Sequence, residues 1–200
     1  GDRVDLGNSG FLLEIDQPER LDQDDVSFNT DRYLVNIKEP ELVFEDAQYQ
    51  YISNYVNEFE DVLFGANFAN PTNGYAAYIN IDSFVDWFLI NEITKNVDAQ
   101  WWSIFFHVIP GEKINMGPLW DFDLSFGNVD YADSQYAQGW WVRNNLWIDR
   151  LLDDPAFVQR VKSRFTYFKS KQTHLLNQID DYAAYLQYAQ AENDDKWQTL

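Results

Sequence analysis

The chain has 200 residues, 46% of them hydrophobic and 18% aromatic, which is enough to bury the core of one domain. Its 33 acidic residues against 14 basic ones give a formal net charge of −19, and such a surface repels the phosphates of a nucleic acid. There is no cysteine, which excludes disulfides, thiolate catalysis and cysteine-bound zinc. No apolar run reaches the roughly 18 residues that membrane insertion requires.

The N-terminal part predicts a few strands followed by a helix. Residues 10–16 and 26–37 are short β-favouring runs that end before Pro40. Beyond Pro40, a helical spacing predicts a helix from about residue 46 to residue 64, with Gly65 as its stop. The apolar residues that carry this spacing are Ile52, Val56, Phe59 and Leu63.

The middle of the chain predicts a helix and then a hairpin. Asp82 or Ser83 can cap a second helix that runs to about Asn96. Residues 103–109 and 113–116 are β-favouring and flank a Pro-Gly turn, which indicates a hairpin.

Helical patterns return in the last third of the chain. Asp154 and Pro155 can start a helix, because proline is favoured at the first helical position, and residues 171–192 predict one more long helix. We therefore predict an α+β fold in a single domain. Residues 1–40 form its strand-rich entry, and residues 41–200 form a mostly helical lobe with the catalytic loops.

Three acidic residues that flank the predicted hairpin are candidates for catalysis: Asp98 precedes it, and Asp121 and Asp123 follow it. A hairpin between Asp98 and Asp121 would bring these two residues together. Phosphoryl transfer needs one carboxylate for the proton of the attacking hydroxyl and another for a divalent metal ion. Protein kinases place a catalytic Asp, a short hairpin and an Asp-Phe-Gly metal site in this order, and Asp121-Phe122-Asp123 has the corresponding position. By spacing alone, the alternative is that these carboxylates only stabilise turns.

The wording of these segments resembles one family. GPLWDFDLSFGN, at residues 117–128, resembles the Pro-x-Trp-Asp-[Phe/Tyr]-[Asp/Asn]-x-x-x-Gly signature of the CotH (spore-coat protein H) kinase-like family. NEITKNVDAQWWSIFF, at residues 91–106, is similar to the catalytic segment of that family in the form typical of gut and fibre-degrading bacteria. The resemblance extends over nearly the whole chain, with further similar stretches at residues 2–6, 10–16, 78–92, 150–165 and 193–200.

The resemblance implies an atypical, secreted or cell-surface bacterial kinase-like domain that uses ATP with Mg²⁺ or Mn²⁺ to phosphorylate protein side chains. Asp98 matches the presumed catalytic residue and Asp121 the metal-binding one, with Asp123 as a further metal ligand. Ser103 stands where protein kinases have a metal-binding Asn. The resemblance also implies that a lobe with the cationic phosphate contact lies upstream of Gly1, so that this chain is an incomplete copy.

Other residues allow additional contacts and a second function. Lys95, Asn96 and Ser103 are candidate nucleotide or phosphate contacts, although Lys95 could equally form a structural ion pair. Trp140 and Trp141, in a polar loop, are candidates for stacking on a ligand. They support an alternative, a non-catalytic extracellular module that binds protein or polysaccharide during carbohydrate degradation. A glycosidase with paired carboxylates is a third reading. Neither a nucleic-acid partner nor membrane insertion is expected.

Overall fold

The computed structural model describes residues 10–44 and 46–198. The chain divides into two compact units, residues 1–161 and residues 162–200. Helices are combined with one antiparallel sheet, which confirms the predicted α+β class.

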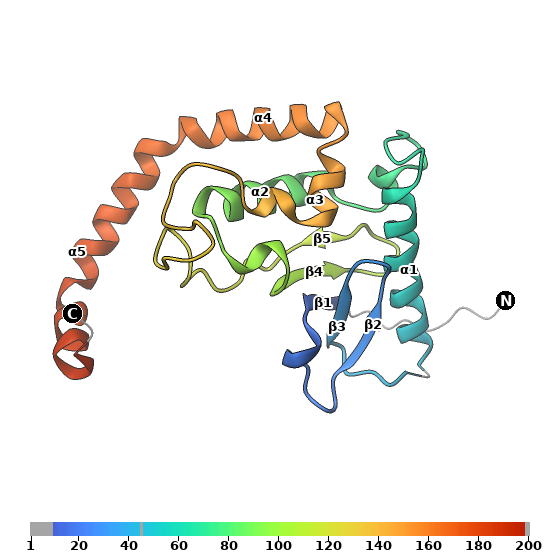
Figure 1. The fold of residues 1–200 in the computed structure, drawn as a ribbon, viewed down its shortest axis with the longest axis horizontal. Helices are drawn as coiled ribbons and strands as arrows, with labels where there is room; N and C mark the ends of the chain where they lie inside the picture. The colour runs from blue at the N-terminus through green and yellow to red at the C-terminus, as the bar shows by residue number, and fades with distance from the viewer. Residues whose placement is uncertain (1–9, 45, 199–200) are drawn as a thin grey trace. The chain divides into compact units, whose positions relative to one another are not determined.

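Five strands form the sheet in the first unit. They are β1 (Phe11–Asp16), β2 (Val26–Asn29), β3 (Leu34–Glu39), β4 (Ile104–Val108) and β5 (Asn115–Met116), in the spatial order β2-β3-β1-β4-β5 (Figure 1). Neighbouring strands are antiparallel throughout. The run at residues 26–37 is split into two strands by a turn, in which the Thr30 amide donates to the Tyr33 carbonyl at 2.9 Å. The predicted hairpin is confirmed as β4 and β5.

The helices follow the predicted apolar spacing. They are α1 (Ala47–Phe64), α2 (Ile81–Thr94), α3 (Leu146–Leu151), α4 (Pro155–Ser170) and α5 (Gln172–Trp197), with short 3₁₀ turns η1 (Pro18–Arg20), η2 (Tyr75–Ala77), η3 (Asp98–Gln100) and η4 (Val142–Asn144). The predicted cap of α4 is confirmed, because the Ala156 amide donates to Asp154 Oδ1 at 2.9 Å.

The predicted cap of α2 is wrong. The N-cap residue is Asn80, and no side chain caps the helix there. Ser83, one of the two predicted caps, lies inside the first turn instead. Its hydroxyl donates to the Asn80 carbonyl at 2.8 Å and accepts from the Met116 amide at 3.2 Å, so it joins α2 to β5.

One face of the sheet forms the core of the first unit. Alternate residues of the strands point to this face, as the pleat requires. Helices α1, α2 and α3 pack against it (Figure 1). Trp147 of α3 lies at the centre: its ring centroid is 5.1 Å from that of Phe59 and 5.5 Å from that of Phe106, with near-perpendicular planes. The core side chains of the strands include Phe11, Leu13, Ile15, Val35, Ile37, Ile104, Phe106 and Val108.

The opposite face of the sheet carries polar side chains. Glu14 of β1 and Asn36 of β3 lie opposite each other there and are buried. Lys38 Nζ lies 3.5 Å from Glu14 Oε2. Burial raises the pKa of Glu14, the charge of Asp16 raises it further, and Lys38 opposes both effects.

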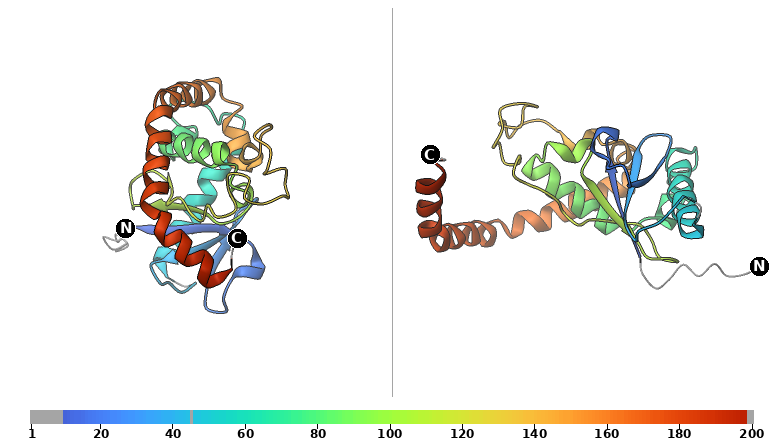
Figure 2. Two further views of the ribbon diagram at one scale, coloured as in Figure 1. Left: turned by 90° about the vertical axis from the view of Figure 1, so that its left-hand side faces the viewer. Right: turned by 90° about the horizontal axis from the view of Figure 1, so that it is seen from below.

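The segment between β5 and α3, residues 117–145, is irregular and stands out beside α2 in the first unit (Figures 1 and 2). The second unit consists of the end of α4 and α5, and α5 has no buried residue. In the part of the chain that the structure describes, none of the helices has the length and apolar character needed to cross a membrane.

Candidate active site

The C-terminal end of α2 organises the candidate site. The helix ends at Thr94, and Lys95 takes a left-handed conformation with φ of 52°. The amide of Asn96 then donates to the Asn91 carbonyl at 2.9 Å. This tight ending turns the chain directly into η3, which begins with Asp98.

Lys95 is a structural residue of this helix end. Its side chain is buried, and Nζ donates to the carbonyl oxygens of Asp133 at 3.0 Å, Tyr136 at 2.8 Å and Gln138 at 2.7 Å. These bonds use all three N–H groups of the ammonium. Lys95 therefore holds the following loop. Its partners are backbone carbonyls, so it forms no ion pair through these bonds and keeps no N–H group for a phosphate.

Glu92, one turn earlier on α2, holds in place the loop that contains Trp140 and Trp141, here called the tryptophan loop. Its two carboxylate oxygens accept from the amides of Trp141 and Arg143, each at 2.8 Å. The indole Nε1 of Trp141 donates to the Val97 carbonyl at 2.8 Å. Trp141 thus anchors the loop, and its ring is partly buried against the core.

Asn96 connects the two segments that carry the candidate carboxylates. Its Nδ2 lies 3.1 Å from Asn91 Oδ1, 3.4 Å from the Trp120 carbonyl and 3.5 Å from the Asp121 carbonyl. The residue is buried, and its Oδ1 has no hydrogen-bond partner among the described residues. Asn96 is therefore better placed to hold the backbone of Asp121 than to contact a phosphate directly.

Asp98 is partly exposed and has one side-chain partner that the sequence did not reveal. Trp102 Nε1 donates to Asp98 Oδ1 at 3.2 Å. Next to Trp102, the hydroxyl of Ser103 accepts from Arg20 Nη1 at 2.9 Å. Arg20 was missed because it belongs to η1, 83 residues away in sequence, and no local pattern marks it.

The electrostatic environment of Asp123 includes the two other candidate acids. Partial desolvation raises the pKa of Asp123, and a hydrogen bond with the Asp121 carboxyl and the charge of Asp121 raise it further. The Leu124 amide lowers this pKa, and the charge of Asp98 raises it slightly. Asp121 and Asp123 thus interact as a carboxyl pair, and Asp98 of the other segment adds the weakest of these effects. Repulsion of this kind favours either a shared proton or a bound cation.

The backbone of this region is strained at several positions. Lys95, Ser103, Asp121 and Phe126 have φ of 52°, 54°, 43° and 57° although none is glycine. Such conformations cost on the order of 1–3 kcal/mol each and gather at functional sites. Surrounding hydrogen bonds maintain them; the Phe126 amide, for example, donates to the Thr94 carbonyl at 2.7 Å.

Two tryptophans of the segment between β5 and α3 are exposed. Trp140 is 61% exposed, and its ring stacks on Phe88 with a centroid distance of 6.4 Å. Trp120 is 53% exposed, and its ring lies 4.9 Å from that of Phe105 on the polar face of the sheet. Of the two tryptophans predicted to stack on a ligand, Trp140 presents the larger accessible surface.

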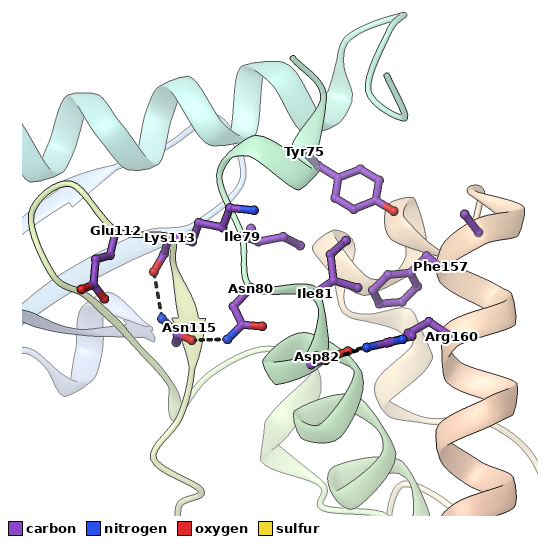
Figure 3. A pocket seen from close by; sticks show the side chains of 11 residues that line it. Tyr75, Ile79, Asn80, Ile81, Asp82, Glu112, Lys113, Asn115, Phe157 and Arg160 are labelled. Carbon is purple, nitrogen blue, oxygen red and sulfur yellow. Dashed lines mark hydrogen bonds and ion pairs between the residues drawn. The ribbon is translucent and has the colours of Figure 1, made fainter. Parts of the chain in front are cut away.

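A separate pocket lies at the other end of α2. Its volume is about 520 Å³, and Figure 3 shows its lining side chains. Arg160 forms an ion pair with Asp82 at 2.6 Å, and Lys113 Nζ donates to the Ala76 carbonyl. The pocket contains none of the predicted site residues; it is lined by Tyr75, Ile79, Asn80, Ile81, Asp82, Glu112, Lys113, Asn115, Ala156, Phe157 and Arg160.

The oxygen ligands near Asp121 suit Mg²⁺ or Mn²⁺. Within residues 10–44 and 46–198, no three or more His, Cys, Asp or Glu side chains form a ready metal cage. Mg²⁺ usually binds through one or two carboxylates together with water and substrate phosphates. The exposed carboxyl groups of Asp121 and Asp123, when ionised, match that donor set.

Comparison with family models gives a match. The model of the family described as CotH kinase protein matches residues 5–200. No curated protein and no solved structure matches the chain.

Proposed function

Because this chain belongs to the CotH kinase protein family, we propose that it is a secreted or cell-surface bacterial domain that transfers the terminal phosphoryl group of ATP to protein side chains, with Mg²⁺ or Mn²⁺. The observation that best supports the proposal is that the β4–β5 hairpin separates Asp98 from Asp121 and Asp123 in sequence, while Asn96 beside Asp98 bonds to the Trp120 and Asp121 carbonyls. The order of the three acids along the chain is the order that protein kinases use.

Asp98 orients the acceptor in this proposal. Trp102 occupies one of its carboxylate oxygens, and no hydrogen bond to the other is seen among the described residues. That oxygen can accept the proton of a serine, threonine or tyrosine hydroxyl as the hydroxyl oxygen attacks the γ-phosphorus. An O–P bond to the acceptor forms, the bond from phosphorus to the ADP oxygen breaks, and ADP leaves with that electron pair.

Asp121 and Asp123 hold the divalent ion. The ion, when bound, neutralises charge on the phosphate oxygens. Asn96 supports the pair from behind through the Trp120 and Asp121 carbonyls, which keeps the metal-binding segment beside the segment of Asp98.

Phosphate transfer from γ-³²P-labelled ATP to protein tests the proposal, using the protein at its natural length with Mg²⁺ and with Mn²⁺. We expect Asp98→Asn and Asp121→Asn each to reduce the rate by about 10²-fold or more, as for loss of acid–base or metal-binding groups. Asp130→Asn, at an exposed acid of the same irregular segment, is the matched control and should retain the rate. Absence of transfer with either metal, or full transfer by Asp121→Asn, would refute the proposed activity.

The exposure of Trp140 supports a second function, binding of protein or polysaccharide without catalysis. An exposed indole offers a stacking surface for sugar rings. Retention on insoluble glycans that disappears in Trp140→Ala would support this function. Equal retention of both proteins, or none, would count against it.

A further inference from the structure

Arg20 has an environment that links it to the candidate catalytic residue. It ends η1, directly after the central strand β1. Its Nη1 donates to the Ser103 hydroxyl at 2.9 Å, and its guanidinium carbon lies 5.8 Å from the centroid of the Trp102 ring. Trp102 in turn donates to Asp98. Trp102 therefore contacts both the guanidinium and Asp98.

The guanidinium of Arg20 still has donors available. The group carries five N–H donors, and the only hydrogen bond seen among the described residues uses one of them. The nearest ion-pair partner, Asp16 Oδ1, is 3.9 Å away, which is too far for a hydrogen bond. The side chain is 42% exposed, so a ligand can reach it.

The surrounding charges leave Arg20 as an accessible cation on this side of the site. Lys95 has given all three N–H groups to loop carbonyls. Lys38 lies against Glu14 on the polar face of the sheet. The acids that face Arg20 are Asp16 and, through its longer-range charge, Glu14.

We propose that Arg20 binds the terminal phosphate of a nucleoside triphosphate beside Asp98. This role rests on the proposed phosphoryl transfer. A planar guanidinium fits two phosphate oxygens at once, and the hydroxyl of Ser103 fixes the orientation of its fork. A fixed cation at this point stabilises the charge that spreads over the phosphoryl oxygens during transfer. Arg20 would thereby supply, from within this chain, a cationic phosphate contact.

Titration calorimetry on the protein at its natural length tests the assignment. The ligands are Mg²⁺ with the non-hydrolysable β,γ-imido analogue of ATP, and Mg²⁺ with ADP. We expect Arg20→Ala to weaken binding of the triphosphate about tenfold or more and binding of ADP far less, because one charge-assisted contact to the last phosphate is lost. Arg20→Lys keeps the charge without the fork. Its affinity for the triphosphate should therefore lie between that of the unmodified protein and that of Arg20→Ala.

Two comparisons make the outcome decisive. Arg143→Ala, which removes an exposed arginine near the tryptophan loop, should leave both affinities unchanged. Circular dichroism verifies that each variant is folded, and Arg20→Gln replaces Arg20→Ala if the latter is not. Equal weakening of triphosphate and diphosphate binding, no weakening, or no triphosphate binding by the unmodified protein would overturn the assignment.

The test separates this assignment from the proposed activity. Transfer that depends on Asp121, with a triphosphate-to-diphosphate preference that Arg20→Ala leaves unchanged, would retain the activity and reject the role of Arg20. A preference that Arg20→Ala removes, in a protein that transfers no phosphate, would retain phosphate binding by Arg20 and reject the activity.

Discussion

At the scale of single residues, Lys95 shows how one side chain can determine the shape of a loop. Its ammonium binds three carbonyl oxygens within residues 133–138, a stretch that has no regular secondary structure. Most residues of this stretch are exposed, and the charge-assisted bonds of Lys95 attach it to the end of α2.

Replacing Lys95 with methionine should loosen this loop. Lys95→Met keeps most of the apolar stem and removes the three hydrogen bonds, so we expect a loss of about 2–3 kcal/mol in the free energy of unfolding in urea. Amide hydrogen exchange should accelerate in residues 131–139. The control is Lys113→Met, which removes one bond from an exposed lysine to the Ala76 carbonyl and should cost less than about 1 kcal/mol. Equal losses in the two variants would contradict the role assigned to Lys95.

At the scale of elements, α2 is the support of the candidate site. Its last turns hold the tryptophan loop through Glu92, and Asn96 just beyond it holds the segment of Asp121. The helix itself is fixed by core side chains such as Phe84 and Phe88. The two loops therefore take their positions from one rigid helix end, as a site with defined geometry requires.

Glu92→Gln should weaken this support. A carboxylate accepts at both oxygens, whereas an amide accepts at one, so either the Trp141 or the Arg143 amide loses its partner. We expect the free energy of unfolding in urea to fall by about 1–2 kcal/mol. Glu112→Gln, at an exposed glutamate, should change it by less than about 0.5 kcal/mol. Unchanged stability of Glu92→Gln would show that water replaces the lost acceptor.

The sequence predicted local elements well and distant contacts poorly. The spacing of Ile52, Val56, Phe59 and Leu63 places α1 correctly, because helical periodicity depends on neighbours along the chain. The turn after Val108 likewise predicts the β4–β5 hairpin. By contrast, the pairing of β1 with β4 depends on burial of one face of a sheet formed by remote segments.

The candidate site follows the same division. The hairpin between Asp98 and Asp121 could be predicted, because its turn is marked by neighbouring residues in the sequence. The roles of Lys95 and Trp141 could not, because their partners are backbone groups of remote residues whose positions no sequence pattern specifies. The contact of Arg20 could not be predicted either, because its partner, the Ser103 hydroxyl, lies 83 residues away in sequence.

At the scale of the molecule, the two units differ in what holds them together. All side chains of the core cluster lie between Phe11 and Phe157, within the first unit. Helix α5 of the second unit has no buried residue, and apolar side chains such as Ile179 and Tyr182 are exposed on it. Burial of apolar area is the main source of folding free energy, so the first unit has its own source.

A protein that ends at Ser170 should therefore fold. We expect its first unit to unfold cooperatively in urea, with a midpoint close to that of the whole chain, because no core side chain is removed. The contrasting truncation ends at Asn145, so that residues 146–170 are removed as well. It deletes Trp147 and should abolish the cooperative transition. Loss of the transition in the first truncation would show that the second unit contributes to the stability of the core.

Because Lys95 supplies the cation that binds three loop carbonyls, this attachment of the loop does not depend on a bound metal ion. In many extracellular proteins an irregular loop is pinned by a calcium ion that converging carbonyl oxygens capture from the medium. Here the cation is covalently part of the polypeptide, so chelators cannot strip it from the loop. Treatment with EDTA should thus leave the amide exchange rates of residues 131–139 unchanged while it stops any phosphate transfer that relies on Asp121.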